Sequence, residues 1–442
     1  MSGLKKRFLM SASTESHATI ESMNQKNKKI NLKFSKNFLW GASISTHQVE
    51  GGNHNQWTRW ELENAKVLAT QAQYHYEDLE VWDEIKEQAS TPKNYVSGAA
   101  ADHFSRYESD FQLAKQLHMN ALRSGIEWSR IEPREGEFDE KALQHYKDYF
   151  SKLRDLGITP IVTLWHWTFP TWFDDMGGFE KRKNIKYFTR YIQHIADAMG
   201  KDFQYVITIN EPTVYTTMSY HEEKWPPAER SRLMTTIVLL NLAKAHRKSY
   251  SILKKANKKI KVGLAHNCAY FYAGDNSRLS KLSAWTTHKF GNEFFINRVK
   301  RHQDFFGLNY YFAKEFHGTV VHNPHDRTND LGWDMQPDKV GPLMERLYAK
   351  YKLPILISEN GLADMHDKNR QWWIAQTVKA MDGAQKSGVE MIGYIHWSLL
   401  DNFEWSEGFW PRFGLIEIDY KTQKRTIRKS ANWYGRLIKT LR

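Results

Sequence analysis

The chain contains a single cysteine, Cys268, among its 442 residues. One cysteine excludes an internal disulfide and any zinc site built from several cysteines. A lone cysteine is most often a buried side chain that packs like a small apolar residue, and we expect that role for Cys268. The scarcity of cysteine is compatible with a reducing compartment.

Long apolar runs are missing as well. Every apolar stretch is interrupted by a charged residue, Asn or Gly, and none approaches the roughly 20 residues of a membrane-spanning helix. Near the start, Lys5, Lys6 and Arg7 resemble the charged beginning of a secretion signal, but only residues 8–10 continue it with apolar side chains. A signal needs an apolar stretch of roughly 7–15 residues. We therefore expect a cytoplasmic protein with no membrane partner.

Several motifs of nucleotide and nucleophile chemistry are also absent. The sequence has no GxGxxG loop, no Walker-type phosphate loop and no GxSxG nucleophile elbow. The string most similar to a zinc motif is His221-Glu222-Glu223, but Trp225 occupies the position of the second helical ligand. We therefore expect no cofactor and no metal.

Negative charge is in deficit, because 63 Lys and Arg face 50 Asp and Glu, for a net charge of +13. An excess of this kind fits either a polyanion partner or simply solvated surfaces. Much of it lies in residues 5–33 and in pairs such as Lys254-Lys255 and Lys258-Lys259, at the end of a predicted helix and just after it. No nucleic-acid motif accompanies it, which favours solvated faces. We expect no nucleic-acid partner.

From residue 34 onward, strand patterns and helix patterns alternate. The predicted strands are residues 38–45, 121–128, 159–165, 205–210, 261–267, 304–311, 354–360 and 391–399. The predicted helices are residues 107–118, 141–156, 187–199, 232–256, 293–300, 340–351, 372–386 and 429–441. Eight parallel strands with right-handed crossovers close most naturally into a barrel. We predict a single-domain α/β protein, a (β/α)8 TIM barrel over residues 34–442, after a flexible tail at residues 1–33.

Residues 51–102 form the longest stretch without a clear strand or helix pattern, and they are rich in Trp and Tyr. Long irregular connections in a compact domain often form a functional site. We expect this stretch to wall a pocket together with the loops that follow Trp165, Tyr311 and Leu400, because parallel barrels place their sites at the carboxyl ends of the strands.

Two of the predicted strands end on a glutamate. The run PILISENG delivers Glu359 to the end of a buried strand, and YVITINEP delivers Glu211 in the same way, before Pro212 stops further pairing. Either acid alone could be structural, and Glu359 could simply pair with Arg123. Together they suit glycosidic bond cleavage, which needs two acids on opposite sides of the anomeric carbon.

Amides, a third glutamate, an arginine, a histidine and flat aromatic rings accompany these two acids at the strand ends. They are Gln48, Arg123, His166, Trp167, Asn210, Asn309, Tyr311, Trp397, Glu404 and Trp405. Acids and amides hydrogen-bond hydroxyl groups, and indole faces stack on sugar rings, so this set predicts a neutral polyhydroxylated ligand. Trp172, Trp333 and Trp410 fit either ordinary packing or contacts to a distal sugar or aglycone.

These motifs resemble glycoside hydrolase family 1, the retaining β-glucosidases and β-glycosidases on a TIM barrel. The resemblance covers residues 34–440 in the family's order. It rests on FLWGASISTHQVEGG, TLWHWTFP, TINEP, DFFGLNYY, ISENG and HWSLLDNFEWSEGFWPRFGLIEID.

The resemblance implies a role for each matching residue. Glu211 would be the general acid/base and Glu359 the nucleophile, with Arg123 and Tyr311 donating hydrogen bonds to Glu359 to orient and stabilise it. We expect Glu211 to lack such donors and to be protonated near neutral pH. The sugar contacts would be Gln48, His166, Trp167, Asn210, Asn309, Tyr311, Trp397, Glu404 and Trp405.

The chain departs from the family pattern in small ways. Thr168 stands where the family usually has Asp, and Ser358 where it usually has Thr. Glu404 argues for an unphosphorylated sugar, and shorter segments after Pro212 and after Asn267 leave the aglycone preference open. The resemblance implies hydrolysis of a β-glucoside or a short oligosaccharide such as cellobiose. A catalytically silent carbohydrate-binding barrel is the alternative, and the oligomeric state stays open.

Overall fold

The computed structural model describes residues 32–325 and 327–442, so residues 1–31 of the predicted tail lie outside the described residues. Eight parallel strands close into a barrel in the spatial order β1-β11-β10-β7-β5-β4-β3-β2. They are β1 (Leu39–Ser43), β2 (Ala121–Gly125), β3 (Thr159–Thr163), β4 (Tyr205–Asn210), β5 (Lys261–Asn267), β7 (Phe306–Tyr310), β10 (Ile355–Asn360) and β11 (Met391–Trp397). This confirms the predicted TIM barrel.

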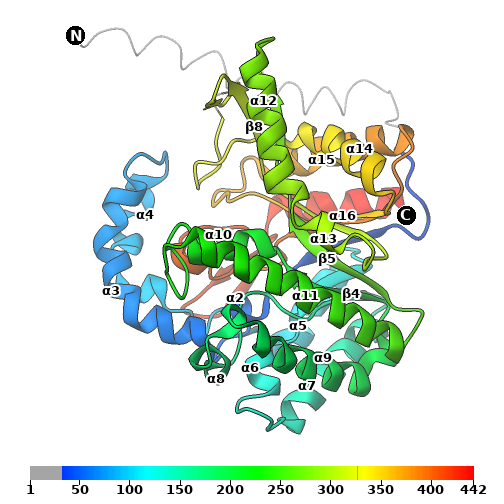
Figure 1. Ribbon diagram of the computed structural model, residues 1–442. Helices are drawn as coiled ribbons and strands as arrows, with labels where there is room; N and C mark the ends of the chain where they lie inside the picture. Colours follow the sequence, from blue (N-terminus) through cyan, green and yellow to red (C-terminus); the bar gives the residue numbers. More distant parts are fainter. Residues whose placement is uncertain (1–31, 326) are drawn as a thin grey trace. The chain divides into compact units, whose positions relative to one another are not determined.

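Helices follow the strands and cover the barrel (Figure 1). The longer ones are α5 (His103–Gln116), α7 (Glu140–Asp155), α9 (Ile185–Met199), α10 (Pro212–Tyr220), α11 (Arg232–Ala256), α14 (Val340–Tyr351), α15 (Arg370–Lys386) and α16 (Lys429–Leu441). Single-turn helices are α2 (Thr46–Val49), α6 (Trp128–Ile131), α8 (Thr171–Asp175) and α13 (Ile296–Val299). Helix α9 packs beside α11, and α14 beside α15. No helix in the described ranges is long and apolar enough to cross a membrane.

The barrel interior is filled by one apolar residue from each strand or from its flank. This buried layer consists of Leu39, Ala121, Ile161, Ile207, Ala265, Phe305, Leu356 and Ile395. Six of the eight lie before or at the middle of their strands, and Ala265 and Ile395 lie just beyond the middle of β5 and β11, so the whole layer lies on the amino-terminal side of the strand ends. The polar strand ends are left to the opposite side, where parallel barrels carry their chemistry.

The prediction of an irregular connection at residues 51–102 is wrong, because this stretch is mainly helical. It contains α3 (Gln56–Tyr76) and α4 (Trp82–Ala89). Asn55 and Thr58 form a capping box at the start of α3. The buried face of α3 is built largely from Ala, such as Ala65 and Ala69, so its hydrophobic periodicity is weak in the sequence. His75, Tyr76 and Leu79 nevertheless line the cavity described below, as expected for this connection.

The segment between β5 and α14 holds elements that the sequence patterns did not indicate. Strands β6 (Tyr270–Ala273), β8 (Ala313–His317) and β9 (Val320–His322) form a three-stranded sheet outside the barrel. Helix α12 (Arg278–Thr287) runs into a π-helical turn (His288–Glu293), so the helix predicted at residues 293–300 is wrong in its extent. A separate hairpin pairs β12 (Ile416–Asp419) with β13 (Lys424–Ile427).

Candidate active site

Glu359 lies at the carboxyl end of β10 and is buried. Arg123 from β2 pairs with its Oε1 through Nη1, and the Tyr311 hydroxyl donates to its Oε2 at 2.6 Å. The residue after Asn360 must be glycine, since a Cβ on Gly361 would lie 1.8 Å from the Trp397 carbonyl oxygen. Arg123 and Tyr311, the two donors that the family resemblance implied, thus hold both carboxylate oxygens of Glu359 before any ligand binds.

The Arg123 guanidinium is itself fixed by three further acceptors. Its Nε donates to Thr163 Oγ1 at 3.0 Å, its Nη2 to Asn210 Oδ1 at 2.6 Å and its Nη1 to the Ser358 carbonyl at 3.2 Å. These bonds leave the side chain one orientation. Because β2, β3, β4 and β10 all contribute, closure of the barrel is what assembles the donor set around Glu359.

Glu211 follows β4 directly, in the left-handed region with a φ of 42°, and Pro212 begins α10. Its Oε1 accepts hydrogen bonds from Asn309 Nδ2 at 2.6 Å and Asn267 Nδ2 at 3.2 Å. As expected, no guanidinium or phenol among the described residues donates to Glu211, and its two amide donors were not predicted in that role. Burial nevertheless raises the pKa of Glu211 to about 8, the negative charge of Glu359 adds to the rise, and the two amides oppose it. Glu211 is thus mainly protonated at neutral pH.

His166 and Trp167 follow β3 and lie next to Asn210. His166 Nε2 is 3.0 Å from Asn210 Nδ2, and Trp167 Nε1 donates to the Asn210 carbonyl at 2.9 Å. Burial, with the charge of Arg123, holds the pKa of His166 well below its usual range. The ring is therefore neutral, and since Nε2 accepts from the amide, its proton resides on Nδ1.

Gln48 and Glu404 form a second polar group in the same cavity. Glu404 Oε2 accepts from Asn402 Nδ2 at 2.8 Å and from Gln48 Nε2 at 3.2 Å. Burial raises the pKa of Glu404 to about 8. Gln48 Oε1 is buried and has no hydrogen-bond partner among the described residues. An acceptor of this kind is costly when it is left unpaired, which suits a site for a ligand hydroxyl group.

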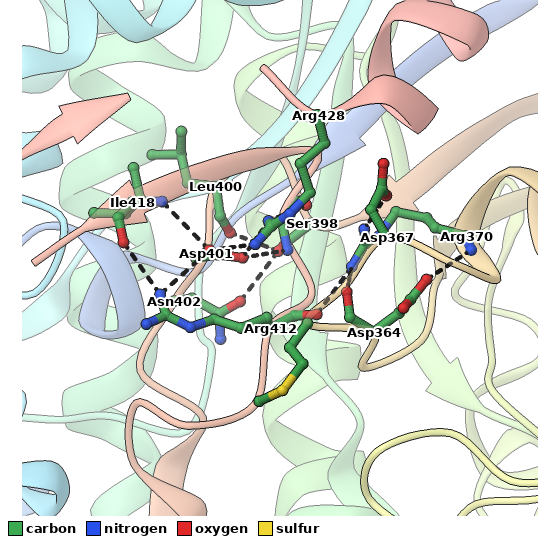
Figure 2. Close-up of polar contacts among 12 residues, drawn as sticks. Asp364, Asp367, Arg370, Ser398, Leu400, Asp401, Asn402, Arg412, Ile418 and Arg428 are labelled. Carbon is green, nitrogen blue, oxygen red and sulfur yellow. Dashed lines mark hydrogen bonds and ion pairs between the residues drawn. The ribbon is translucent and has the colours of Figure 1, made fainter. Parts of the chain in front are cut away.

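Asp401 anchors the loop that carries Glu404 and Trp405. Figure 2 shows Asp401 between Arg428 and Arg412, with Arg428 donating through Nη1 at 2.8 Å and Nη2 at 3.1 Å. Burial raises the pKa of this carboxyl, but the charges of Arg428 and Arg412 outweigh it and hold the pKa of Asp401 below its usual range. A buried, fully paired acid fixes the start of the loop and hence the position of Glu404.

A cavity of about 830 Å³ joins these groups. The predicted residues that line it are Gln48, His166, Trp167, Glu211, Tyr311, Glu359, Trp397, Glu404 and Trp405. Arg123, Asn210 and Asn309 are fully buried behind this lining and hold it in place. The roles of all these side chains toward a sugar stay predictions.

Some lining residues were missed from the sequence, and others were left open. Asn267, Trp225 and Phe413 line the cavity although no prediction included them. The tryptophan that ends the zinc-like string, Trp225, packs 4.5 Å from Trp167, ring centre to ring centre. Of the three undecided tryptophans, Trp333 lines the cavity, whereas Trp410 packs against Tyr76 and Trp172 against Trp128. Only the closed barrel brings these distant segments together.

A group with metal-binding side chains lies on the β8–β9 hairpin. Glu315, His317 and His322 each offer a ligand atom, and these atoms lie within 4.8 Å of one another. The antiparallel register places Glu315 opposite His322, which their sequence spacing did not suggest. The intervening Lys314, Phe316 and Val321 line the cavity instead, so this group faces away from the two glutamates.

Comparison with known proteins agrees with this geometry. The chain matches glycosyl hydrolase family 1 over residues 30–305 and 296–442. It is 28% identical over 455 residues to β-glucosidase A of Thermotoga maritima, covering 92% of this chain and 98% of that one. It is 29% identical over 357 residues to the chloroplastic galactolipid galactosyltransferase SFR2 of Arabidopsis thaliana, covering 75% of this chain and 57% of that one.

A solved structure shows the same likeness in three dimensions. The β-glycosidase from Pyrococcus horikoshii superimposes with a TM-score of 0.81 at 33% identity, covering 93% of this chain and 96% of that one. The match extends over the barrel and over both strand ends that carry Glu211 and Glu359. The chain belongs to glycosyl hydrolase family 1.

Proposed function

We propose that this glycosidase is a retaining β-glycosidase of the β-glucosidase type, which releases a terminal β-glycosyl residue through a covalent glycosyl-enzyme. The observation that carries the proposal is the difference between two facing acids. Glu359 is the anionic member of an ion pair with Arg123, whereas the pKa of Glu211 is raised to about 8. A nucleophile has to be anionic and a general acid protonated, so each glutamate is in the form that its role needs.

The reaction has two displacements. Glu359 attacks the anomeric carbon while Glu211 gives its proton to the departing glycosidic oxygen. Loss of this proton leaves Glu211 as a carboxylate, which its two amide donors stabilise. Glu211 then takes a proton from water as the water attacks the glycosyl-enzyme, and Glu359 is released. Retention requires the two carboxyl groups to be about 5 Å apart.

Gln48 and Glu404 would hold the sugar. The free Gln48 Oε1 accepts from one hydroxyl group, and the Glu404 carboxyl reaches the O4 and O6 hydroxyls. Contacts at O4 discriminate glucose from galactose, and contacts at O6 discriminate galactose from fucose, which is 6-deoxygalactose. A panel of β-glucoside, β-galactoside, β-fucoside and cellobiose would rank these substrates.

Azide rescue tests the two roles separately. Glu359→Gly and Glu211→Ala are assayed on nitrophenyl β-glucoside with and without azide. In the first variant azide attacks from the side of Glu359 and gives the α-glycosyl azide. In the second variant Glu359 still forms the glycosyl-enzyme, and azide then gives the β-glycosyl azide. Turnover of Glu359→Gly at the wild-type rate would overturn the assignment, since removal of a nucleophile costs on the order of 10⁴-fold or more.

Two alternatives differ from hydrolysis. A silent carbohydrate-binding barrel would bind glycosides without turnover, and the presence of both paired acids argues against it. Transfer to an alcohol in place of water would use the same glycosyl-enzyme, and one relative carries the name of a galactosyltransferase. Product analysis at high substrate concentration with an added alcohol decides between transfer and hydrolysis.

A further inference from the structure

Helix α12 (Arg278–Thr287) has its apolar side chains on the wrong face for an ordinary surface helix. The residues that it buries are small, Ser280 and Ala284. Its solvent side carries Leu279, Leu282 and Trp285, which are 52%, 55% and 55% exposed. A helix that packs on a protein core normally turns its large apolar residues inward. The sequence of α12 is therefore suited to a second apolar surface outside this chain.

The exposed apolar surface continues beyond the helix. Phe290 of the adjoining π-helical turn is 71% exposed, and Val320 and Val321 of β9 are 67% and 44% exposed. The hairpin contacts the helix directly, because the Gly318 amide donates to Ser280 Oγ at 2.6 Å. We call Leu279, Leu282, Trp285, Phe290, Val320 and Val321 the α12 patch.

In the α12 patch, exposed apolar side chains are clustered and not scattered singly over the surface. Six of the eleven exposed large apolar side chains of the described residues belong to it. Figure 1 shows α12 extending outward with β8 beside it, so nothing else in the described part of the chain covers its outer side. Clustered exposed apolar side chains mark interaction surfaces, whereas scattered ones need no explanation.

The charged side chains along α12 and the adjoining turn are of one sign. Between residues 277 and 292 the charged side chains are Arg278, Lys281 and Lys289, all cationic. Burial lowers the pKa of His288 to about 4, which leaves that residue neutral. The nearby acids Asp275 and Glu315 lie 3.5 Å and 2.8 Å from His317 nitrogens, and buried Glu293 pairs with Lys289. Apolar and aromatic side chains among Lys and Arg are typical of helices that lie on anionic membranes.

The patch is continuous with the cavity that holds the two glutamates. Val321 is exposed in the patch and also lines the cavity. Phe271 of β6 and Phe316 of β8, from the same small sheet, line the cavity too. An apolar wall therefore leads from the site of the chemistry to the patch.

We propose that the α12 patch docks on an anionic lipid surface and that the cavity accepts β-glycosides with an apolar chain as aglycone from that surface. The sugar part of this inference rests on the proposed function. The absence of long apolar runs argued against a membrane partner, but it bears only on spanning a bilayer. Docking needs an exposed apolar face with cationic neighbours, which α12 provides.

Vesicle binding tests the surface without any assay of activity. The full chain is sedimented with phosphatidylcholine vesicles that contain or lack phosphatidylglycerol. The patch variant combines Leu282→Ser, Trp285→Ser and Phe290→Ser, and the matched control combines Leu62→Ser and Leu233→Ser, which are equally exposed on α3 and α11. We expect wild type and control to bind the anionic vesicles and the patch variant to bind at least tenfold more weakly, with salt weakening all binding.

Three outcomes of the sedimentation would overturn the proposal. One is wild-type protein that stays in the supernatant with anionic vesicles. Another is equal loss of binding in the patch variant and the control. The third is a dimer in sedimentation velocity that the patch variant dissociates, because the patch would then be covered by a second copy of the chain.

Kinetics test the link between the patch and the cavity. For a glycolipid with a β-glucosyl head group in anionic vesicles, we expect kcat/KM of the patch variant to fall at least tenfold. For water-soluble nitrophenyl β-glucoside, kcat/KM of the same variant should equal that of wild type. Equal losses on both substrates would overturn the link. Failure of the proposed function would give another result: neither wild type nor any variant would cleave a glycoside, while vesicle binding would persist.

Discussion

The two ends of the cavity differ in how firmly their side chains are positioned before a ligand binds. At the inner end, Glu359 and Glu211 are buried and Glu404 is partly buried, and each accepts at least two hydrogen bonds. At the outer end, Phe271, Phe316 and Val321 line the cavity with apolar surface, and Val321 also belongs to the α12 patch. Directed polar groups recognise hydroxyl stereochemistry, whereas an apolar wall recognises only size and apolarity. We infer strict selection of the sugar and loose selection of the aglycone.

Within the inner end, the partners of the acids set their forms. Glu359 has a cation and a phenol as donors, and Glu211 has two neutral amides. The two amides offset only part of the effect of burial and of the Glu359 charge, so the pKa of Glu211 is raised to about 8. The asymmetry that the proposed reaction needs is thus present in the side chains that surround the two acids.

Among substitutions that keep the nucleophile, Glu211→Gln should have the largest effect. This change keeps the shape but removes the transferable proton, and positioned acid catalysis contributes roughly 10²–10⁴-fold. We expect kcat/KM for cellobiose to fall by that factor. The first displacement should stay near normal on dinitrophenyl β-glucoside, whose leaving group needs no proton. Equal losses on the two substrates would contradict the assignment of Glu211 as the acid.

Tyr311→Phe removes one donor from Glu359 and leaves Arg123 in place. A hydrogen bond to a charged group contributes about 1.5–3 kcal/mol, so we expect kcat to fall roughly 10- to 100-fold. The thermal midpoint should change little, because the ring stays packed. Tyr310→Phe, on the adjacent residue, serves as a control, since that hydroxyl donates to the Gln336 carbonyl away from Glu359. A larger kcat loss in the control would show that packing of the strand and not the donor matters.

The barrel and its acids could be predicted from the sequence because both follow from local patterns. Strands β4 and β5 have the predicted bounds, since a β-branched run in β4 and a short, mainly apolar run in β5 each end on polar residues. Glu359 and Glu211 were found as acids at strand ends, and the roles of Arg123 and Tyr311 as donors to Glu359 came from the family resemblance. Patterns of period two and sharp strand ends do not depend on distant contacts.

The features that the sequence did not predict either depend on closure of the barrel or have weak hydrophobic patterns. The amide donors of Glu211 come from β5 and β7, which become its neighbours only in the barrel order. Helix α3 was missed because Ala65 and Ala69 give its buried face little hydrophobicity. The apolar side of α12 could not be assigned to solvent, since exposed and buried apolar faces look alike in a sequence.

Val321→Ser changes the outer end alone. Loss of an apolar contact of this size costs about 1 kcal/mol, so kcat/KM for octyl β-glucoside should fall roughly three- to tenfold. The value for methyl β-glucoside should stay the same, because its aglycone does not reach the outer wall. Val67→Ser on α3, an exposed valine outside the cavity, is the matched control. Parallel losses on both glucosides would remove the distinction between the two ends.

The smallest expected effect is a shift of the pH profile in Asn267→Ala. With the pKa of Glu211 near 8, kcat/KM of the wild type should decline as the pH rises through about 8, where the acid loses its proton. The Asn267 amide stabilises the ionised form and so lowers this pKa. Its removal should raise the pKa and move the alkaline limb to higher pH, by less than about one unit because Asn309 still donates. Asn276→Ala, in the exposed loop before α12, should leave the limb in place. If the alkaline limb of Asn267→Ala moved to lower pH, the amide would stabilise the protonated form of Glu211. The difference between the two glutamates would then not come from their hydrogen-bond donors.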